Sequence, residues 1–433
     1  MTDSLRSQKT MSRASIAIAA FSTVVEWYDF TLYLYFATVL SRVFFGSGEN
    51  ALSTTLAAFA IAYLLRPLGG FVFGHIGDRF GRRRTMLLSV ALMTMTMLAT
   101  GLLPTHAQVG ATAGWLLFLL RCLMGFSVGG EYIAVVAYLL EGAPRSRRGL
   151  ITSMAPASSE VGGLLAVGVS LLTVNSLSSA SLDSWGWRIP FFVGAVLAAS
   201  VWVARTTMQE SPDFERQRAS GTAPARPLLY ALTNHRAGIL RAFAIAALGS
   251  ITYYIGVTYV PTFLTFAGKL DESDSLRLST AAAVAVILVT PLAGALSDRL
   301  GRKPVLIFLS ICNAILPIVL FRLMAGGSPS YALLAAVILA CVTGAVSAVG
   351  AIAIAEQFPG EGRISGLALG ATTATAIFGG ATPYVAQVLT ERTGWIMVPG
   401  AMIAVVAVLV LPILMSLPET APRSEPATRA SPT

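Results

Sequence analysis

The chain has 433 residues, of which 55% are hydrophobic and only 12% are charged, and its formal net charge is +9. With a mean hydropathy of +0.72 it has too little polar surface for a soluble globular protein, so the composition indicates a polytopic membrane protein. The basic residues lie in alternate loops, an arrangement that sets membrane topology, and they therefore argue against nucleic-acid binding.

The chain begins with a polar, basic segment that shows no signal-peptide cleavage site, so we expect its first apolar stretch to be retained as a helix. Because about 20 apolar residues cross a bilayer core, the apolar segments predict an all-α membrane protein with twelve transmembrane helices. The helices are expected near residues 16–40, 54–76, 84–103, 113–140, 150–174, 188–206, 238–265, 278–297, 304–325, 331–356, 364–390 and 395–417.

The stretch 207–237 is rich in proline and charge, too polar to cross a membrane and too short to fold alone. We therefore expect it to be a cytoplasmic linker between two pseudo-symmetric six-helix halves. The predicted organisation is an N-terminal tail at 1–15, a first half at 16–206, the linker at 207–237, a second half at 238–417 and a C-terminal tail at 418–433.

Two short patterns recur and support a duplication. The pattern Gly-x-x-x-Asp-Arg-x-Gly-Arg begins at Gly74 and again at Gly294, 220 residues later. A second pattern, Glu-x-x-Pro-x-x-x-Arg, begins at Glu141 and at Glu356, an offset of 215 residues. Internal repeats of this kind build secondary transporters from two homologous halves.

The distribution of lysine and arginine predicts the orientation. The two tails and the loops on the same side as the tails hold 22 of the 30 basic residues. Because basic residues concentrate on the cytoplasmic side of a membrane, both termini are expected in the cytoplasm.

The repeated loops also carry an acid beside the arginines, which the rule for membrane orientation does not explain. Opposite charges that pair when the cytoplasmic side closes and part when it opens would bias an alternating-access equilibrium. We therefore predict a cytoplasmic gate, with topology determinants as the alternative. The gate residues are Asp78, Arg79, Arg82, Glu141, Arg148, Asp298, Arg299, Arg302, Glu356 and Arg363.

Four carboxylates inside the predicted spans are candidates for proton coupling: Glu26, Asp29, Glu131 and Glu160. A charge at mid-bilayer costs at least ~2.5–3.5 kcal/mol, so such groups should face a cavity or have a partner. Glu26 and Asp29 are three residues apart and share a helix face, and paired carboxylates in a dry site can take up and release a proton. The alternative is that they form fixed ion pairs with neighbouring arginines.

Candidate substrate-binding residues are Arg121, Arg66, Tyr28, Tyr253 and Tyr254. The fork of Arg121 can hold a carboxylate through two hydrogen bonds; it could equally control the protonation of nearby acids or form a structural ion pair. Arg66 precedes Pro67, which predicts a kinked helix at this point. The tyrosines could donate hydroxyl groups to a small polar ligand or serve only in packing.

Several strings resemble one transporter family. They are EWYDF at 26–30, LRPLGG at 65–70, GFSVGGEY at 125–132 and WGWRIPF at 185–191. Together with the two Asp-Arg-x-Gly-Arg loops they resemble the major facilitator superfamily, and within it the metabolite:proton symporters. That branch takes up organic acids such as citrate, 2-oxoglutarate and shikimate, and also proline and betaine. The resemblance covers residues 16–417 and favours a functional role for Arg121. It implies a location in the inner membrane of a bacterium.

The expected function is therefore proton-coupled import of a small organic carboxylate, such as a di- or tricarboxylate, by alternating access. The alternatives are proton-coupled uptake of a zwitterionic osmolyte such as proline or betaine, efflux of a drug or metabolite, and a sensor that no longer transports. No nucleophile triad, metal cluster or phosphate loop indicates an enzyme or a metal site. We expect a monomer with no cofactor, driven by the proton gradient, whose partners are an organic acid, protons and the lipid bilayer.

Overall fold

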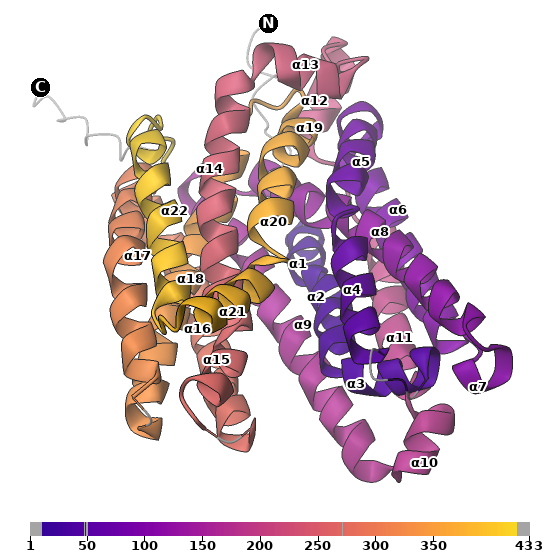
Figure 1. Ribbon diagram of the computed structural model, residues 1–433. Helices are drawn as coiled ribbons and strands as arrows, with labels where there is room; N and C mark the ends of the chain where they lie inside the picture. The colour runs from indigo at the N-terminus through magenta and orange to yellow at the C-terminus, as the bar shows by residue number, and fades with distance from the viewer. Residues whose placement is uncertain (1–10, 47, 49–50, 271, 327, 422–433) are drawn as a thin grey trace, which may run out of the picture.

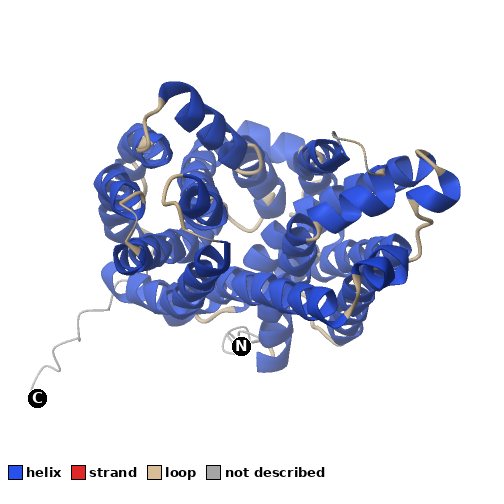
Figure 2. Ribbon diagram, turned by 60° about the horizontal axis from the view of Figure 1, so that its bottom comes forward, coloured by secondary structure: helices blue, strands red, loops and turns tan. Residues whose placement is uncertain are grey.

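The computed structural model describes residues 11–46, 48, 51–270, 272–326 and 328–421. The predicted tails, 1–15 and 418–433, lie largely outside these residues. The described chain is built from helices joined by short loops and contains no strand (Figure 2).

The first half is formed by eleven α-helices and three short η segments that precede the linker. They are α1 (Arg13–Phe21), α2 (Thr23–Tyr35), α3 (Ala37–Leu40), η1 (Ser41–Phe45), α4 (Ala51–Tyr63), α5 (Arg66–Phe80), α6 (Arg82–Gly101), α7 (His106–Val109), α8 (Thr112–Gly142), η2 (Arg145–Arg147), α9 (Arg148–Ser176), α10 (Ser179–Ser181), η3 (Leu182–Gly186) and α11 (Arg188–Thr206). Between the halves lie two short helices, α12 (Pro212–Ser220) and α13 (Pro227–Asn234).

The second half repeats the plan with more interruptions. Its elements are α14 (Arg236–Tyr253), η4 (Tyr254–Thr258), α15 (Val260–Phe266), α16 (Glu272–Leu300), α17 (Arg302–Met324), α18 (Pro329–Ala355), α19 (Arg363–Leu367), η5 (Ala368–Thr372), α20 (Thr373–Phe378), α21 (Thr382–Thr393) and α22 (Val398–Met415). Two of the interruptions, η4 and η5, are single π-helical turns. Such turns are frequent at functional sites.

Within the described chain, eleven helical stretches are long and apolar enough to cross a membrane. They correspond to all the predicted spans except the first. That span is divided into α1, α2, α3 and η1, and it carries Glu26 and Asp29, which lower its hydropathy. The arrangement is consistent with the predicted twelve-helix architecture.

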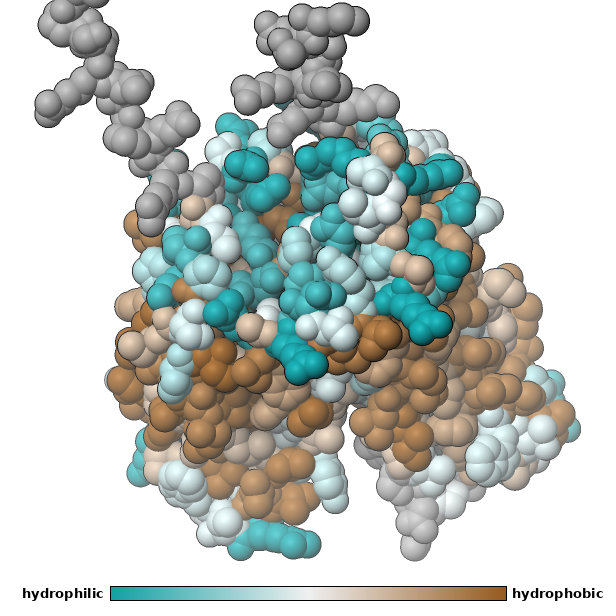
Figure 3. All heavy atoms as spheres, turned by 90° about the horizontal axis from the view of Figure 1, so that it is seen from above, coloured by the Kyte–Doolittle hydropathy of each residue, from teal (hydrophilic) through white to brown (hydrophobic). Residues whose placement is uncertain are grey.

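The helices form two bundles side by side, and both ends of the described chain lie on one face, which we call the terminus face (Figure 1). Helix α9 of the first half packs along α16 of the second, and α5 packs against α19. Hydrophilic residues gather on the terminus face, whereas hydrophobic residues cover the flanks that would contact lipid (Figure 3).

The repeated loops owe their shape to one glycine each. Gly81, between α5 and α6, has φ +113°, and Gly301, between α16 and α17, has φ +103°, values that side-chain-bearing residues rarely adopt. A Cβ at either position would collide with a carboxylate, that of Glu210 or Glu419. Each glycine therefore turns the chain sharply and leaves room for an acid from the end of its own half.

Close backbone contacts place α4 and α5 against α8. A Cβ at Gly125 or Gly129 of α8 would collide with the carbonyl of Ala62 or Arg66, and small residues at such positions allow helices to approach closely. The chain is interrupted between α4 and α5, as the proline after Arg66 predicts. This break puts Arg66 at the first position of α5, beside the space between the halves.

Candidate functional site

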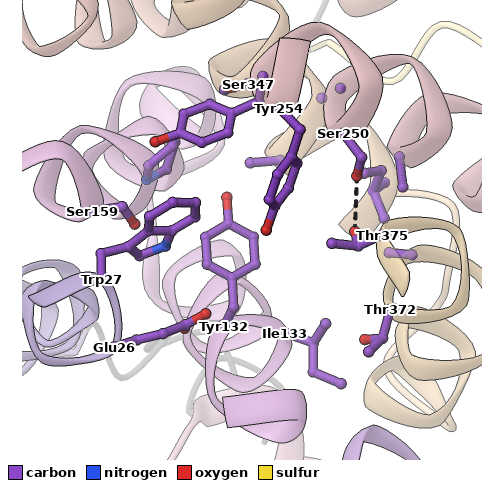
Figure 4. Close-up of a pocket in the computed structure, with 18 of the residues that line it drawn as sticks. Glu26, Trp27, Tyr132, Ile133, Ser159, Ser250, Tyr254, Ser347, Thr372 and Thr375 are labelled. Atoms are coloured by element: carbon purple, nitrogen blue, oxygen red, sulfur yellow. Dashed lines mark hydrogen bonds between the residues drawn. The ribbon is translucent and has the colours of Figure 1, made fainter. Parts of the chain in front are cut away.

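A cavity of about 170 Å³ lies between the two halves. Helices α2, α5, α8 and α9 form one side, and α14, α16, α18, α20 with the turns η4 and η5 form the other. Its polar lining consists of Glu26, Arg66, Tyr132, Ser159 and Glu160 from the first half and Ser250, Tyr253, Tyr254, Ser347, Thr372 and Thr375 from the second (Figure 4). Among these lining residues, every charged group belongs to the first half and the second half contributes hydroxyl groups.

Glu26 and Arg66 form the ion pair of the cavity. Glu26 is 2% exposed, and its Oε1 accepts a hydrogen bond of 3.3 Å from Nη1 of Arg66. The guanidinium of Arg66 also lies 4.4 Å from the centre of the Tyr63 ring, and an aromatic face attracts a cation. Arg66 is thus held by a carboxylate and an aromatic ring while it lines the cavity.

Glu160 is the second acid of the cavity, and its surroundings differ from those of Glu26. It lies on α9, one helical turn after Pro156, and forms no ion pair within the described part of the chain. Its carboxylate is hydrogen-bonded to the hydroxyl of Tyr253, which comes from the opposite half. A buried carboxylate without a cation carries a desolvation cost, so Glu160 is suited to bind either a proton or a positively charged ligand group.

Aromatic side chains join the two halves beside the cavity. The rings of Trp27 and Tyr253 meet edge to face at 5.0 Å between centroids, and the hydroxyls of Tyr63 and Tyr254 are 2.5 Å apart. Figure 4 shows Trp27, Tyr132 and Tyr254 pointing toward the same space. The cavity therefore has an aromatic wall with an acid, Glu160, at its edge.

Asp29 and Arg121 form a second buried ion pair, 2.7 Å between Oδ2 and Nη1. Nη2 of Arg121 also donates to Thr100 at 3.3 Å. Neither Asp29 nor Arg121 lines the main cavity; both line a smaller chamber that they share with Glu26 and Arg66. In this conformation Arg121 is therefore placed to act on Asp29 and not directly on a ligand in the main cavity.

Two further residues of the sequence-based site also lie away from the main cavity. Tyr28 is 1% exposed and donates its hydroxyl to the carbonyl of Pro190 at 2.8 Å, so it packs inside the first half, away from the cavity. Glu131 forms a buried ion pair with Arg205, and Nη2 of Arg205 also donates to Ser22 at 2.5 Å. The sequence did not single out Arg205, because its place at the end of a span made it look like one more basic loop residue.

At the terminus face, the acid of each repeated loop accepts hydrogen bonds from the start of a helix in the opposite half. Asp78 of α5 accepts from the backbone N–H groups of Ile364 and Ser365 at 3.2 and 2.8 Å. Asp298 of α16 accepts from Gly149 and Leu150 at 2.8 and 3.0 Å. A carboxylate at a helix N-terminus is favoured by the free N–H groups and the helix dipole, so these contacts hold the halves together.

A buried charge network surrounds the first of these contacts. Glu141 pairs with Arg82 at 2.9 Å and with Arg363 of the opposite half at 2.6 Å. Arg363 also approaches Asp213 of α12 at 3.2 Å. Glu141 therefore pairs with Arg363 of the opposite half, and within the described chain it forms no ion pair with Arg148, which lies closer in the sequence.

The ion pairs of the second repeated loop lie within the second half. Arg302 pairs with Asp298 at 2.8 Å and with Glu356 at 3.3 Å. In the part of the chain that the structure describes, Arg79, Arg148 and Arg299 take part in no ion pair. Seven of the ten predicted gate residues are thus brought together, and these three arginines are not.

Two further acids complete the face and were missed from the sequence. Glu210 accepts from the backbone N–H groups of Arg82 and Arg83 at 3.0 and 3.2 Å, and Glu419 accepts from those of Arg302 and Lys303 at 2.9 and 3.1 Å. Burial raises the pKa of Glu210, while N–H donors from Ser211 and Arg83 act in the opposite direction. The signal was present, since each acid follows the last helix of its half beside a Ser or Thr and a Pro.

Comparisons with known proteins agree with this architecture. A family model described as "Sugar (and other) transporter" matches residues 15–228, and one described as "Major Facilitator Superfamily" matches residues 269–432. A proline/betaine transporter of Salmonella typhimurium is 31% identical over 426 residues, covering 95% of this chain and 84% of the relative. An alpha-ketoglutarate permease of Escherichia coli is 34% identical over 387 residues, covering 88% of each chain.

Among solved structures, the proton:xylose symporter XylE bound to 6-bromo-6-deoxy-D-glucose superposes with a TM-score of 0.76 at 19% identity, over 94% of this chain and 96% of that one. At this identity the likeness concerns the fold. Taken with the sequence relatives, it shows that the chain belongs to the major facilitator superfamily of membrane transporters.

Proposed function

We propose that the protein is a proton-coupled symporter that imports a small zwitterion of the betaine or proline kind by alternating access. The observation that carries this proposal is the position of Glu160. It is an acid without a cationic partner in the described chain, beside an aromatic wall and in the same cavity as a single guanidinium, that of Arg66.

The two ends of a zwitterion match this arrangement. Aromatic faces and a carboxylate attract an ammonium group, and Trp27, Tyr253 and Glu160 supply both in one place. The carboxylate end would exchange with Glu26 for Arg66, whose guanidinium prefers such a partner. The hydroxyl groups of the second half can complete the hydrogen bonding.

The charges of the cavity disfavour a tricarboxylate. One guanidinium faces two acids, Glu26 and Glu160, so an anion with several charges would be poorly compensated. The volume, about 170 Å³, is also well below the ~300–1,000 Å³ of pockets that hold drug-sized ligands. Both features support a small substrate with little net charge, and several relatives agree, among them proline/betaine transporters and an ectoine/proline transporter.

Coupling to protons is assigned to the acids of α2. Asp29 and Glu26 lie on one helix face, each beside an arginine, and protonation of either acid would release its arginine. A released Arg66 binds the substrate carboxylate. Binding and protonation then favour each other, as symport requires.

The terminus face is assigned as the gate and, by the positive-inside rule, as the cytoplasmic side. The hydrogen bonds of Asp78 and Asp298 cross between the halves at this face. The structure would then represent the state that is closed to the cytoplasm. Breaking both contacts would be the step that opens it.

A second candidate is import of an organic carboxylate, favoured by the similarity to the alpha-ketoglutarate permease. In that case Arg66 would bind one carboxylate and Arg121, freed from Asp29, a second. The two candidates differ in the role of Glu160, which a zwitterion needs and a dicarboxylate does not.

The test is uptake into proteoliposomes under an imposed proton gradient, with betaine, proline, 2-oxoglutarate, citrate and shikimate as competitors. We expect betaine or proline to be accumulated and the acids to compete weakly. Competition by 2-oxoglutarate without any by betaine or proline would reject the zwitterion and support the carboxylate. Glu160→Gln provides the internal comparison, because it should impair zwitterion uptake only.

A further inference from the structure

A small chamber of about 30 Å³ adjoins the substrate cavity inside the first half. Both ion pairs of this region reach it, since its lining includes Glu26, Arg66, Asp29 and Arg121. Glu26, Arg66 and Val128 line the cavity as well as the chamber, so the two spaces share a wall.

Three buried atoms of the chamber residues have no hydrogen-bond partner in the described chain. They are Oε2 of Glu26, Oδ1 of Asp29 and Nε of Arg121, and all three residues are at most 3% exposed. Buried polar atoms are normally satisfied by protein or by water. The space exceeds the ~10–15 Å³ that one water molecule needs. The residues that line it carry two unpaired acceptors and one unpaired donor, within the two to four polar partners that water requires.

We propose that water in this chamber relays a proton between Glu26 and Asp29, an inference that rests on the proton coupling proposed above. Oε1 of Glu26 and Oδ2 of Asp29 are engaged by their arginines, so the relay uses the opposite oxygen of each carboxylate. The two acids are three residues apart on α2, so their side chains share one face of the helix, and both line the chamber.

The transfer conserves atoms and charge. Protonated Glu26 gives its proton to the water oxygen, and the same water gives another proton to Oδ1 of Asp29. One O–H bond breaks at Glu26, one forms at Asp29, and the water is unchanged. The result is an ionised Glu26, which competes with the substrate carboxylate for Arg66, and a neutral Asp29 that no longer neutralises Arg121. The proton thus leaves the wall of the substrate cavity for a site that the substrate does not reach.

The relay can be blocked by narrowing the chamber without changing any charge. Ala62 on α4 lines the chamber but not the cavity and is 4% exposed. We expect Ala62→Val to lose most of the betaine accumulation driven by a proton gradient, and most of the proton uptake triggered by betaine, measured with a pH-sensitive dye inside proteoliposomes. Counterflow exchange of betaine should remain near the level of the unmodified protein. Ala58→Val is the matched control, because Ala58 is buried one turn earlier on α4 and lines neither space.

Met124→Phe is a second variant that narrows the chamber, since Met124 lines it from α8. It keeps the test decisive if Ala62→Val does not fold. Accumulation at the unmodified level in either folded variant overturns the relay, and so does an equal loss of counterflow and accumulation. The proposed function fails separately: in that case the unmodified protein itself shows neither gradient-driven accumulation nor proton uptake with any substrate of the panel.

Discussion

The contact of Asp78 with the start of α19 allows a quantitative test of the gate. Asp78 is fully buried and accepts two backbone hydrogen bonds from the opposite half, at 3.2 and 2.8 Å. Its ion pair with Arg82, at 3.4 Å, lies within its own half and should persist when the halves separate. The replacement Asp78→Asn keeps the size of the side chain, removes its charge and turns one acceptor into a donor.

The size of the effect follows from the hydrogen bonds that are lost. A hydrogen bond to a charged group contributes about 1.5–3 kcal/mol, and Asn can replace only one of the two. We therefore expect the closed state of the terminus face to lose ~1.5–3 kcal/mol relative to the open state, which corresponds to a ~10–150-fold shift of the equilibrium. The transport cycle requires the terminus face both to open and to close. A shift of this equilibrium should therefore slow transport, while substrate binding is retained.

The population of the two states can be measured with a pair of spin labels. Arg84 on α6 and Arg236 on α14 are exposed and belong to different halves, so labels at these positions report their separation at the terminus face. The native Cys122, Cys312 and Cys341 must first be replaced. We expect Asp78→Asn to enlarge the fraction with the longer distance.

Asp298→Asn is the matched variant, since Asp298 makes the equivalent contacts, at 2.8 and 3.0 Å, in the second copy. It should shift the equilibrium in the same direction, and distant sites should add in the double variant. Unchanged distance distributions and normal transport in both variants would refute the gate and leave the loops as topology determinants alone.

Three more outcomes are expected. Glu160→Gln should weaken binding of betaine more than that of 2-oxoglutarate, because the lost acid faces the ammonium group; equal binding of betaine before and after, measured by calorimetry, would contradict this. Asp29→Asn should abolish substrate accumulation driven by the proton gradient but retain counterflow exchange. Full accumulation in that variant would show that Asp29 is not the proton-binding residue. Glu131→Gln should destabilise the protein by about 3–5 kcal/mol, because it leaves Arg205 buried without its partner; adding Arg205→Met should recover part of the melting temperature, and a double variant no more stable than the single would contradict the ion-pair explanation.

Much of the fold follows from local sequence features. The length of the apolar segments predicts the spans, and within the described chain eleven of them correspond to helical stretches that are long and apolar enough to cross a membrane. The first span is divided at Ser22 and Phe36, and it also carries Glu26 and Asp29, which lower its hydropathy. The loops that repeat at Gly74 and Gly294 correspond to equivalent turns in the structure, because a positive φ requires glycine at the same step of each copy.

The charged residues of the spans were also identifiable from the sequence, since a charge in the bilayer is costly and needs a reason. Their partners were not. Glu131 meets Arg205, 74 residues away, and Glu141 meets Arg363, 222 residues away. Such pairings depend on how helices pack across and between the halves, and no local spacing encodes them.

The sequence by itself therefore determined the membrane character, the duplication and most of the charged residues inside the spans, because composition, helix length and repeated turns are local properties. Only the tertiary structure decided which of these residues face the cavity. In the structure Tyr28 and Glu131 lie away from the cavity and Arg121 pairs with Asp29. Glu160 lines the cavity without a cationic partner in the described chain. The reason is that burial and pairing arise from contacts between helices that are far apart in the sequence. The packing of these helices decides whether a charged side chain forms an ion pair or lines the cavity.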